Sequence, residues 1–226
     1  MDKLLRARPG DQFNHSAEEW GWVREAAAAG GDRTEAAARV MRRVLESRYL
    51  AYRRAGLEGL PPFARAAGKR TSPGAELAAS TEAMPVIRQR TPDFYQAYRN
   101  YPKGSAEGIQ HRYFWEKKTA DGRPLFSLRH EMVQLRPELA LIANREYYIS
   151  NNVDSYQVVI ILVPYGNQTL AVLVNQTYTQ NVAGAKRFVA VRVGRSIVES
   201  NTKPLFEKLQ KALGRAKPTV AGAAAP

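Results

Sequence analysis

Residues 109–179 constrain the fold more than any other stretch of the chain, because they read as five consecutive β-strands. Tyr, Phe, Trp, Val and Ile dominate this stretch, and such side chains suit a pleated, half-buried surface. Turn residues such as Asp121-Gly122 and Gly166-Asn167 stand at the breaks. The expected strands are Ile109–Lys118, Leu125–Leu135, Leu139–Ser150, Ser155–Tyr165 and Thr169–Thr179.

The short breaks also predict the direction of neighbouring strands. Parallel strands need long crossover connections, so short turns favour antiparallel pairs. The run 158–163 is apolar at every position, which places this strand centrally in the sheet. The sequence therefore predicts an α+β fold: a curved antiparallel sheet of five or more strands, with N-terminal helices and a C-terminal helix packed on it.

Helices are expected before the sheet region. Ser16 and Glu19 form a capping box for a helix to about Ala29, and Asp32 begins a long helix that Gly56 ends. Shorter helices are expected after Ser72 and after Thr91, beyond a loop over 57–75 that is rich in Gly and Pro. The apolar face of the long helix consists of Met41, Val44, Leu45, Tyr49 and Tyr52.

After the sheet, residues 183–199 fit either a strand or a helix, and their length favours a helix. A final helix is expected to end at Gly214. The chain then divides into an N-terminal arm (1–31), a helical segment packed on the sheet (32–108), the sheet with the C-terminal helices (109–214) and a tail (215–226).

The net charge of +13, an excess of basic over acidic residues, is the unusual feature of the composition. Much of the excess lies at 183–217, where the acidic residues are Glu199 and Glu207. A cationic helix face suits an acidic protein complex or an anionic membrane surface. Nucleic acid is a weaker candidate, because no recognition motif or stacking aromatics accompany the charge. The candidate partner-binding residues are Trp20, Trp22, Lys186, Arg192, Arg195, Lys208, Lys211 and Arg215.

Sequence motifs do not predict an enzyme, a cofactor or a metal site. The chain has no Cys, no Walker loop, no dinucleotide-binding glycine motif and no nucleophile elbow. One alternative stays open: His111 and His130 lie on adjacent expected strands, with Glu116 or Glu131 nearby. A His pair with a carboxylate can perform acid–base chemistry. This pattern would fit a hydrolase or an isomerase.

Polar residues inside the expected strands give a further alternative. Arg129 and Arg145 share a register parity, as do Glu131, Gln157 and Gln176. If helices cover that face, these side chains must be hydrogen-bonded or paired, and they would line a polar pocket. A cavity between the sheet and the C-terminal helix would make the protein a carrier of an apolar small molecule. Its candidate ligand-binding residues are Tyr113, Trp115, Phe126, Arg129, Arg145, Tyr148, Asn175 and Phe188.

Short polar and aromatic segments carry a resemblance to known proteins. Residues 145–150 through 155–157, and 175–184 followed by Gly194-Arg195, resemble segments of an uncharacterised family of bacterial proteins. Members of that family are typically exported, which implies an extracytoplasmic location, although no signal peptide is visible at residues 1–10. The sheet followed by a C-terminal helix is also similar to START-like helix-grip proteins, in which the helix closes a cavity.

The sequence therefore favours a non-catalytic accessory or structural subunit that docks through the basic face of its C-terminal helices. The apolar-ligand carrier and the His-dependent enzyme remain the alternatives. Fold alone does not decide among them.

Overall fold

A computed structural model describes residues 2–10, 13–120, 123–151 and 153–178. They belong to one compact unit, Met1–Gln180, whereas the second unit, Asn181–Pro226, lies outside the described residues. The helices expected over 183–214 and the tail are therefore outside the described part as well. The same holds for Phe188 and for the basic candidates Lys186, Arg192, Arg195, Lys208, Lys211 and Arg215.

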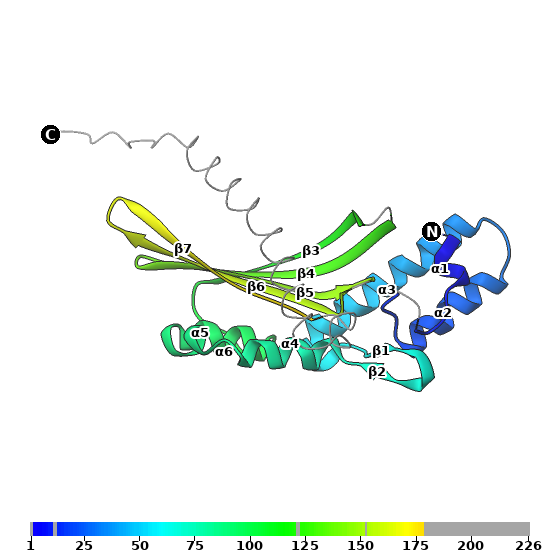
Figure 1. Cartoon of the computed structure of the whole chain (residues 1–226), viewed down its shortest axis with the longest axis horizontal. Helices are drawn as coiled ribbons and strands as arrows, with labels where there is room; N and C mark the ends of the chain where they lie inside the picture. Colours follow the sequence, from blue (N-terminus) through cyan, green and yellow to red (C-terminus); the bar gives the residue numbers. More distant parts are fainter. Residues whose placement is uncertain (1, 11–12, 121–122, 152, 179–226) are drawn as a thin grey trace, which may run out of the picture. The chain divides into compact units, whose positions relative to one another are not determined.

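The predicted antiparallel sheet is confirmed. Its strands lie side by side in chain order, each antiparallel to the next, and helices lie against one of its faces (Figure 1). The first hairpin is longer than expected, because pairing continues to Ala120 and Arg123. The strands are β3 (Ile109–Ala120), β4 (Arg123–Arg136), β5 (Leu139–Ile149), β6 (Ser155–Tyr165) and β7 (Gln168–Tyr178).

The helices that the capping signals predict are present. Ser16 and Glu19 form the capping box of α2, and the Asp32 side chain accepts hydrogen bonds from the first turn of α3. No helix in the described ranges is long and apolar enough to cross a membrane. The helices are α1 (Asp2–Arg6), α2 (Ala17–Ala28), α3 (Arg33–Ala55), α4 (Pro73–Glu82), α5 (Pro85–Arg90) and α6 (Pro92–Asn100).

The expected loop over 57–75 contains short elements that the sequence did not predict. A 3-10 turn over Gly56–Gly59 precedes a small antiparallel hairpin of β1 (Phe63–Ala64) and β2 (Arg70–Thr71), and a second 3-10 turn, Ala66–Gly68, joins its two strands. Each strand is two residues long, so no alternating pattern can develop in it. The hairpin lies at the same end of the unit as α1 and α2 (Figure 1).

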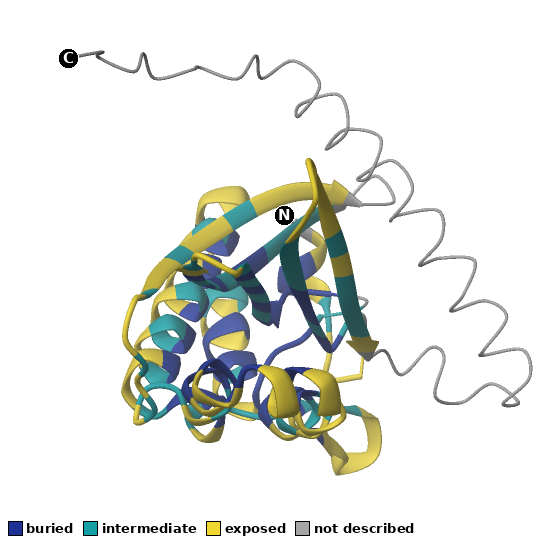
Figure 2. Cartoon of the chain, turned by 90° about the vertical axis from the view of Figure 1, so that its left-hand side faces the viewer, coloured by how far each residue is buried: buried dark blue, intermediate teal, exposed yellow. Residues whose placement is uncertain are grey.

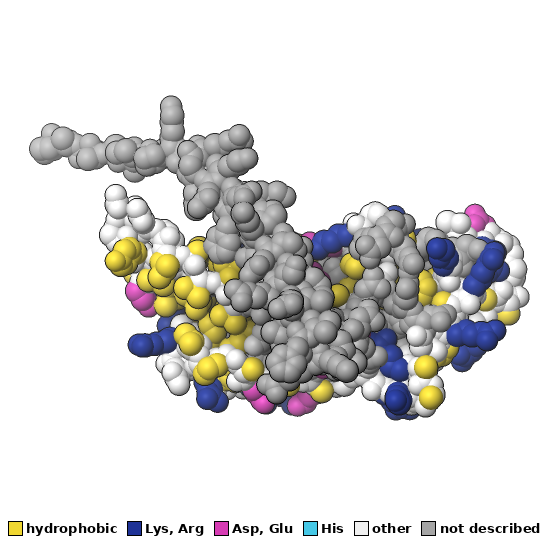
Figure 3. Space-filling model, in the orientation of Figure 1, with side chains coloured by type: hydrophobic (Ala, Val, Ile, Leu, Met, Phe, Trp, Pro, Cys, Tyr) yellow, Lys and Arg dark blue, Asp and Glu magenta, His cyan; other side chains and the backbone are white. Residues whose placement is uncertain are grey.

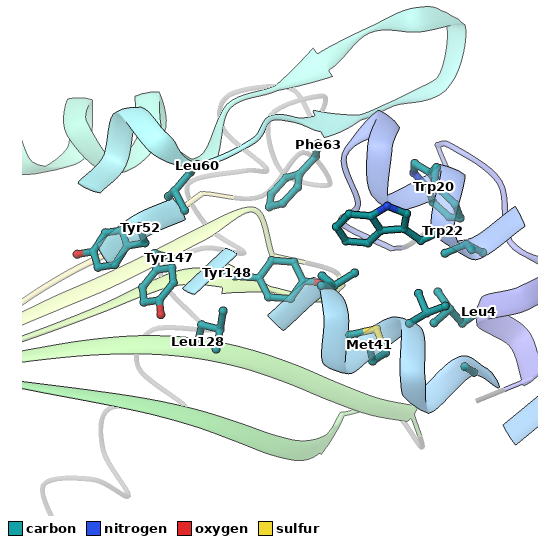
Figure 4. Packing of buried hydrophobic residues seen from close by; sticks show 14 of the residues in the cluster. Leu4, Trp20, Trp22, Met41, Tyr52, Leu60, Phe63, Leu128, Tyr147 and Tyr148 are labelled. Atoms are coloured by element: carbon teal, nitrogen blue, oxygen red, sulfur yellow. The ribbon is translucent and has the colours of Figure 1, made fainter. Parts of the chain in front are cut away.

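Two hydrophobic clusters fill the space between the helices and the sheet. The first joins α1, α2 and α3 to the ends of β4 and β5, and it includes Trp20, Tyr52, Phe63 and Tyr148 (Figure 4). The second joins α5 and α6 to β4, β5 and β6. Buried residues concentrate between the layers, whereas the margins of the sheet are more exposed (Figure 2).

A buried ion pair fixes α2 against α3 within the first cluster. Arg48 Nε and Nη2 donate to the two carboxylate oxygens of Glu19 over 2.7 and 2.8 Å. The Arg48 guanidinium also lies over the rings of Phe63 and Tyr148. Burial raises the pKa of Glu19, but Arg48 and His15 together outweigh burial and hold that pKa at about 2.

We expect Arg48→Met to destabilise the protein by about 3–5 kcal/mol, because it leaves the Glu19 carboxylate buried without its partner. Chemical denaturation of wild type and variant measures the difference. Arg39→Met is the matched control, since Arg39 pairs with Glu35 on the exposed surface of α3. That change should cost less than about 1 kcal/mol. Equal costs for the two variants would contradict the role of the buried pair.

Candidate functional site

Arg145 is the most unusual residue between the helices and the sheet. Its side chain projects from β5 toward the helices and has 0 % of its surface exposed. Within the described residues, no carboxylate forms an ion pair with it, and its Nε has no hydrogen-bond partner. The guanidinium lies 3.8 Å from the centre of the Tyr98 ring. A buried cation without a carboxylate must be stabilised by neutral polar groups and aromatic rings.

Neutral polar groups from separate elements surround Arg145. Its Nη1 donates to Tyr52 Oη over 3.4 Å, and its Nη2 donates to Thr81 Oγ1 over 3.3 Å. Gln157 Oε1 accepts a 2.7 Å hydrogen bond from the Tyr98 hydroxyl. We call this set the Arg145 network; it consists of Tyr52, Thr81, Tyr98, His130, Arg145 and Gln157.

A chain of hydrogen bonds leads from Arg145 toward the surface. Tyr52 Oη lies 2.8 Å from His130 Nδ1, and His130 Nε2 lies 3.0 Å from His111 Nδ1. Because Tyr52 accepts from Arg145, its own hydrogen can be donated to His130. His130 then carries its hydrogen on Nε2 and donates it to His111, which is exposed. Each donor in the chain thus points away from the cation.

The burial of His130, His111 and Tyr52, together with nearby charges, determines whether these side chains are protonated. Burial lowers the pKa of His130 to about 2, assisted by the nearby charges of Arg145, His111 and Arg53. Burial and the Arg53 charge also lower the pKa of His111. Burial raises the pKa of Tyr52 to about 12, although Arg145 opposes this shift. At neutral pH, His130 and Tyr52 are therefore both uncharged.

A cleft adjoins the network through one tyrosine. Tyr101 stacks on the ring of Tyr52 and packs against His130, with ring centroids 5.1 and 4.5 Å apart. Tyr101 also lines a cleft of about 630 Å³ whose other walls include Leu57 and Gly74. A Cβ on Gly74 would lie 2.1 Å from the Leu57 carbonyl oxygen, so this close approach requires glycine.

The structure brings some of the predicted ligand-binding residues together and separates others. Tyr113 joins the network, because its ring stacks on His130 and its hydroxyl donates to Tyr101. Phe126 and Tyr148 pack in the first hydrophobic cluster, whereas Trp115 is 67 % exposed. Asn175 is half-buried on the opposite face of the sheet from Arg145. The cavity beside a C-terminal helix lies outside the described residues, so the carrier alternative stays a prediction.

Arg129 and Arg145 share a parity in the sequence, but they lie on opposite faces of the sheet. Arg145 is paired with His130, while Arg129 is paired with Phe114 and forms an ion pair with Glu116 on the outer face. The sequence predicted that Glu116 or Glu131 lies near the histidine pair. Both glutamates instead lie on the outer face of the sheet, away from the two histidines. Parity within one strand does not reveal the register between strands.

Trp20 and Trp22 are buried, with 1 % and 9 % of their surfaces exposed. They anchor α2 to the body of the chain. Thr81 and Tyr98 were not predicted as site residues, and Tyr52 was predicted only as part of the apolar face of the long helix. The available signal for this site was Gln157, a polar residue that directly precedes the apolar run of β6.

The two edges of the sheet differ in charge. Edge strand β3 carries Arg112, Glu116, Lys117 and Lys118, which discourage pairing with a further strand. Edge strand β7 has eleven residues and contains no charged residue, Gly or Pro. In the described part of the chain, β7 pairs only with β6. Its main-chain groups on the side away from β6 therefore have no strand partner among the described residues.

Comparisons of the chain with protein-family models, with curated proteins and with solved structures found no match. The resemblance to an uncharacterised bacterial family therefore stays a prediction. No group of three or more potential metal ligands occurs among the residues that the structure describes.

We expect the free energy of unfolding to fall as the pH is lowered from about 6.5. Below this pH the unfolded chain protonates His130, whereas the folded chain keeps it neutral down to about pH 2. The loss should approach ~1.4 kcal/mol per pH unit. Glu76 has the opposite effect, because burial and the Asp154 charge raise its pKa to about 7. Between pH 4.5 and 7 its contribution to stability therefore decreases as the pH rises.

Denaturation between pH 5 and 7 in a Glu76→Gln background isolates the contribution of the histidine. Adding His130→Gln to this background should remove most of the remaining slope. An unchanged slope after His130→Gln would show that His130 is not held neutral by the fold.

Proposed function

We propose that the protein is an accessory subunit that acts by binding an acidic protein partner, which adds an extended strand to β7. The observation that carries this proposal is the contrast between the charged edge β3 and the uncharged edge β7. Exposed sheet edges recruit extended segments through main-chain hydrogen bonds, while alternate side chains provide specificity.

Exposed apolar side chains support β7 as the docking edge. Leu170 and Val172 are 53 % and 39 % exposed, and Tyr165 at the end of β6 is exposed as well. Hydrophobic side chains gather over this end of the sheet in Figure 3. A partner strand would remove such side chains from water, at ~25 cal/mol per Å² of apolar surface.

Charge favours an acidic partner over a second copy of the chain. Two copies with a net charge of +13 repel each other. Exposed Arg88 and Arg90 lie on α5, which packs through Ile87 against the same cluster as Val174 of β7. Acidic groups of a partner could meet these arginines while its strand pairs with β7.

We expect Leu170→Lys combined with Val172→Lys to abolish capture of the partner, because charges on an edge strand oppose pairing. Affinity purification at low salt, followed by mass spectrometry, measures capture. Trp115→Lys on β3 is the matched control and should keep it. The captured protein should be acidic and should dissociate at high salt.

Capture that survives the β7 variants would contradict the proposal. So would concentration-dependent self-association in sedimentation experiments that the same variants remove, because the occupant of β7 would then be a second copy.

Acid–base chemistry by the histidine pair is a second candidate, favoured by the 3.0 Å contact between His111 and His130. His111 would exchange a proton with a substrate, and His130 would orient its imidazole. Saturable hydrolysis of an activated ester that is lost in His111→Gln would support this candidate. Hydrolysis that is the same in wild type and variant would exclude the histidine as its cause.

A further inference from the structure

A cleft of about 400 Å³ lies between α2 and the turn that joins β1 to β2. Its cationic lining residues are Arg24, Arg65, Lys69 and Arg70, and none of the described residues that line it is acidic. Like charges around a concavity repel one another and attract anions. The lining is therefore suited to a ligand that carries more than one negative charge.

One wall of the cleft is fixed by a polar network. Arg65 forms an ion pair with Asp154, donates to Asn14 Oδ1 over 2.8 Å and donates to Thr71 Oγ1 over 3.2 Å. The amide of Ala64 also donates to the His15 carbonyl over 2.8 Å. These contacts tie the hairpin to the body, so the cleft does not have to form when a ligand arrives.

The turn packs closely against the N-terminal segment. Gly10 has a φ of +100°, and a Cβ at this position would lie 2.7 Å from the Ala66 side chain. In the same turn, Ala67 has a φ of 54°, a conformation that is uncommon outside glycine. Such backbone conformations persist only where the surrounding structure imposes them. The turn thus holds Lys69 and Arg70 at the rim of a defined cleft.

The remaining cations have no acidic partner among the described residues. Asp154 pairs with Arg65, but no ion pair to Arg24, Lys69 or Arg70 occurs within the ranges that the structure describes. A second observation concerns Trp20, which also lines the cleft. Its Nε1 is a buried donor without a hydrogen-bond acceptor. An unused buried donor is costly, and because Trp20 lines the cleft, its indole signal reports on an anion bound there.

We propose that this cleft binds a phosphate group, presented by a soluble small molecule or by a lipid headgroup. Phosphate oxygens accept charge-assisted hydrogen bonds from Arg and Lys. The geometry of a phosphate group also matches the forked N–H donors of an arginine. The volume of the cleft lies within the range of small-molecule sites. This inference is independent of the docking edge β7, which belongs to another part of the fold.

The test titrates the full chain, labelled with ¹⁵N, with inorganic pyrophosphate and separately with vesicles of phosphatidylcholine and phosphatidic acid. The indole signal of Trp20, assigned through Trp20→Phe, should shift in a saturable way. Arg24→Gln/Lys69→Gln/Arg70→Gln should weaken the apparent affinity at least about tenfold. Arg42→Gln/Arg88→Gln/Arg90→Gln removes the same charge elsewhere and should change affinity little. Circular dichroism checks that both triple variants remain folded.

A response to pyrophosphate identifies a soluble ligand, and a response to vesicles alone identifies a lipid headgroup. Either response supports the proposal when it depends on the three cleft cations. The proposal is overturned if neither probe produces a saturable shift, or if both triple variants weaken binding equally, since binding would then follow net charge alone. Loss of the pyrophosphate-induced rise in Tm in the cleft variant provides a second readout.

Discussion

A buried guanidinium without a carboxylate is the constraint on which the packing of helices against the sheet depends. Taking a charge out of water costs several kcal/mol, so Arg145 can lie between the layers only where polar groups replace water. Those groups come from elements far apart in the sequence. They are Tyr52 of α3, Thr81 of α4, Tyr98 of α6, His130 of β4 and Gln157 of β6. A shift of any one element would leave the cation or its neighbours unsatisfied.

Burial keeps Tyr52 and His130 uncharged, and the charge of the same cation adds to this effect at His130. Arg48 is also fully buried, but its bidentate contact with Glu19 neutralises it locally. Arg145 has no such counter-charge in the described residues, and its positive field opposes a second positive charge on His130. A neutral His130 can accept from Tyr52 and donate to His111, so the chain of hydrogen bonds depends on the burial of His130 together with the charge of Arg145.

Local sequence signals were sufficient for the five-stranded sheet and the capped helices, but not for the β1–β2 hairpin or for this site. Capping by Ser16 and Asp32 and the turn residues between strands act over a few positions, so helices and antiparallel order could be predicted. The partners of Arg145 lie 64 and 93 residues away in the sequence. Their meeting depends on strand register and on the placement of helices, neither of which a single strand's pattern encodes.

An irregularity in the pairing of β4 decides which face of this strand is turned toward Arg145. The register between β4 and β5 shifts at Leu128/Arg129, after which His130 lies opposite Arg145. Displacing the pairing by one residue would turn the other face of β4 toward Arg145. Side chains on either face of β4 are available in the sequence, and the packing of the folded chain determines which face lies against Arg145.

The part of the sheet that is buried under the helices differs from the margin that we propose for binding. Over β4, β5 and the start of β6, buried apolar and polar groups link every strand to a helix. Toward Leu170 and Val172 this cover ends, and the strands extend into a margin where apolar side chains are exposed. Charged residues at such a margin would cost the folded chain little, and β3 carries them. Their absence from β7 therefore does not follow from folding alone, and this contrast is the reason why we propose β7 as the docking edge.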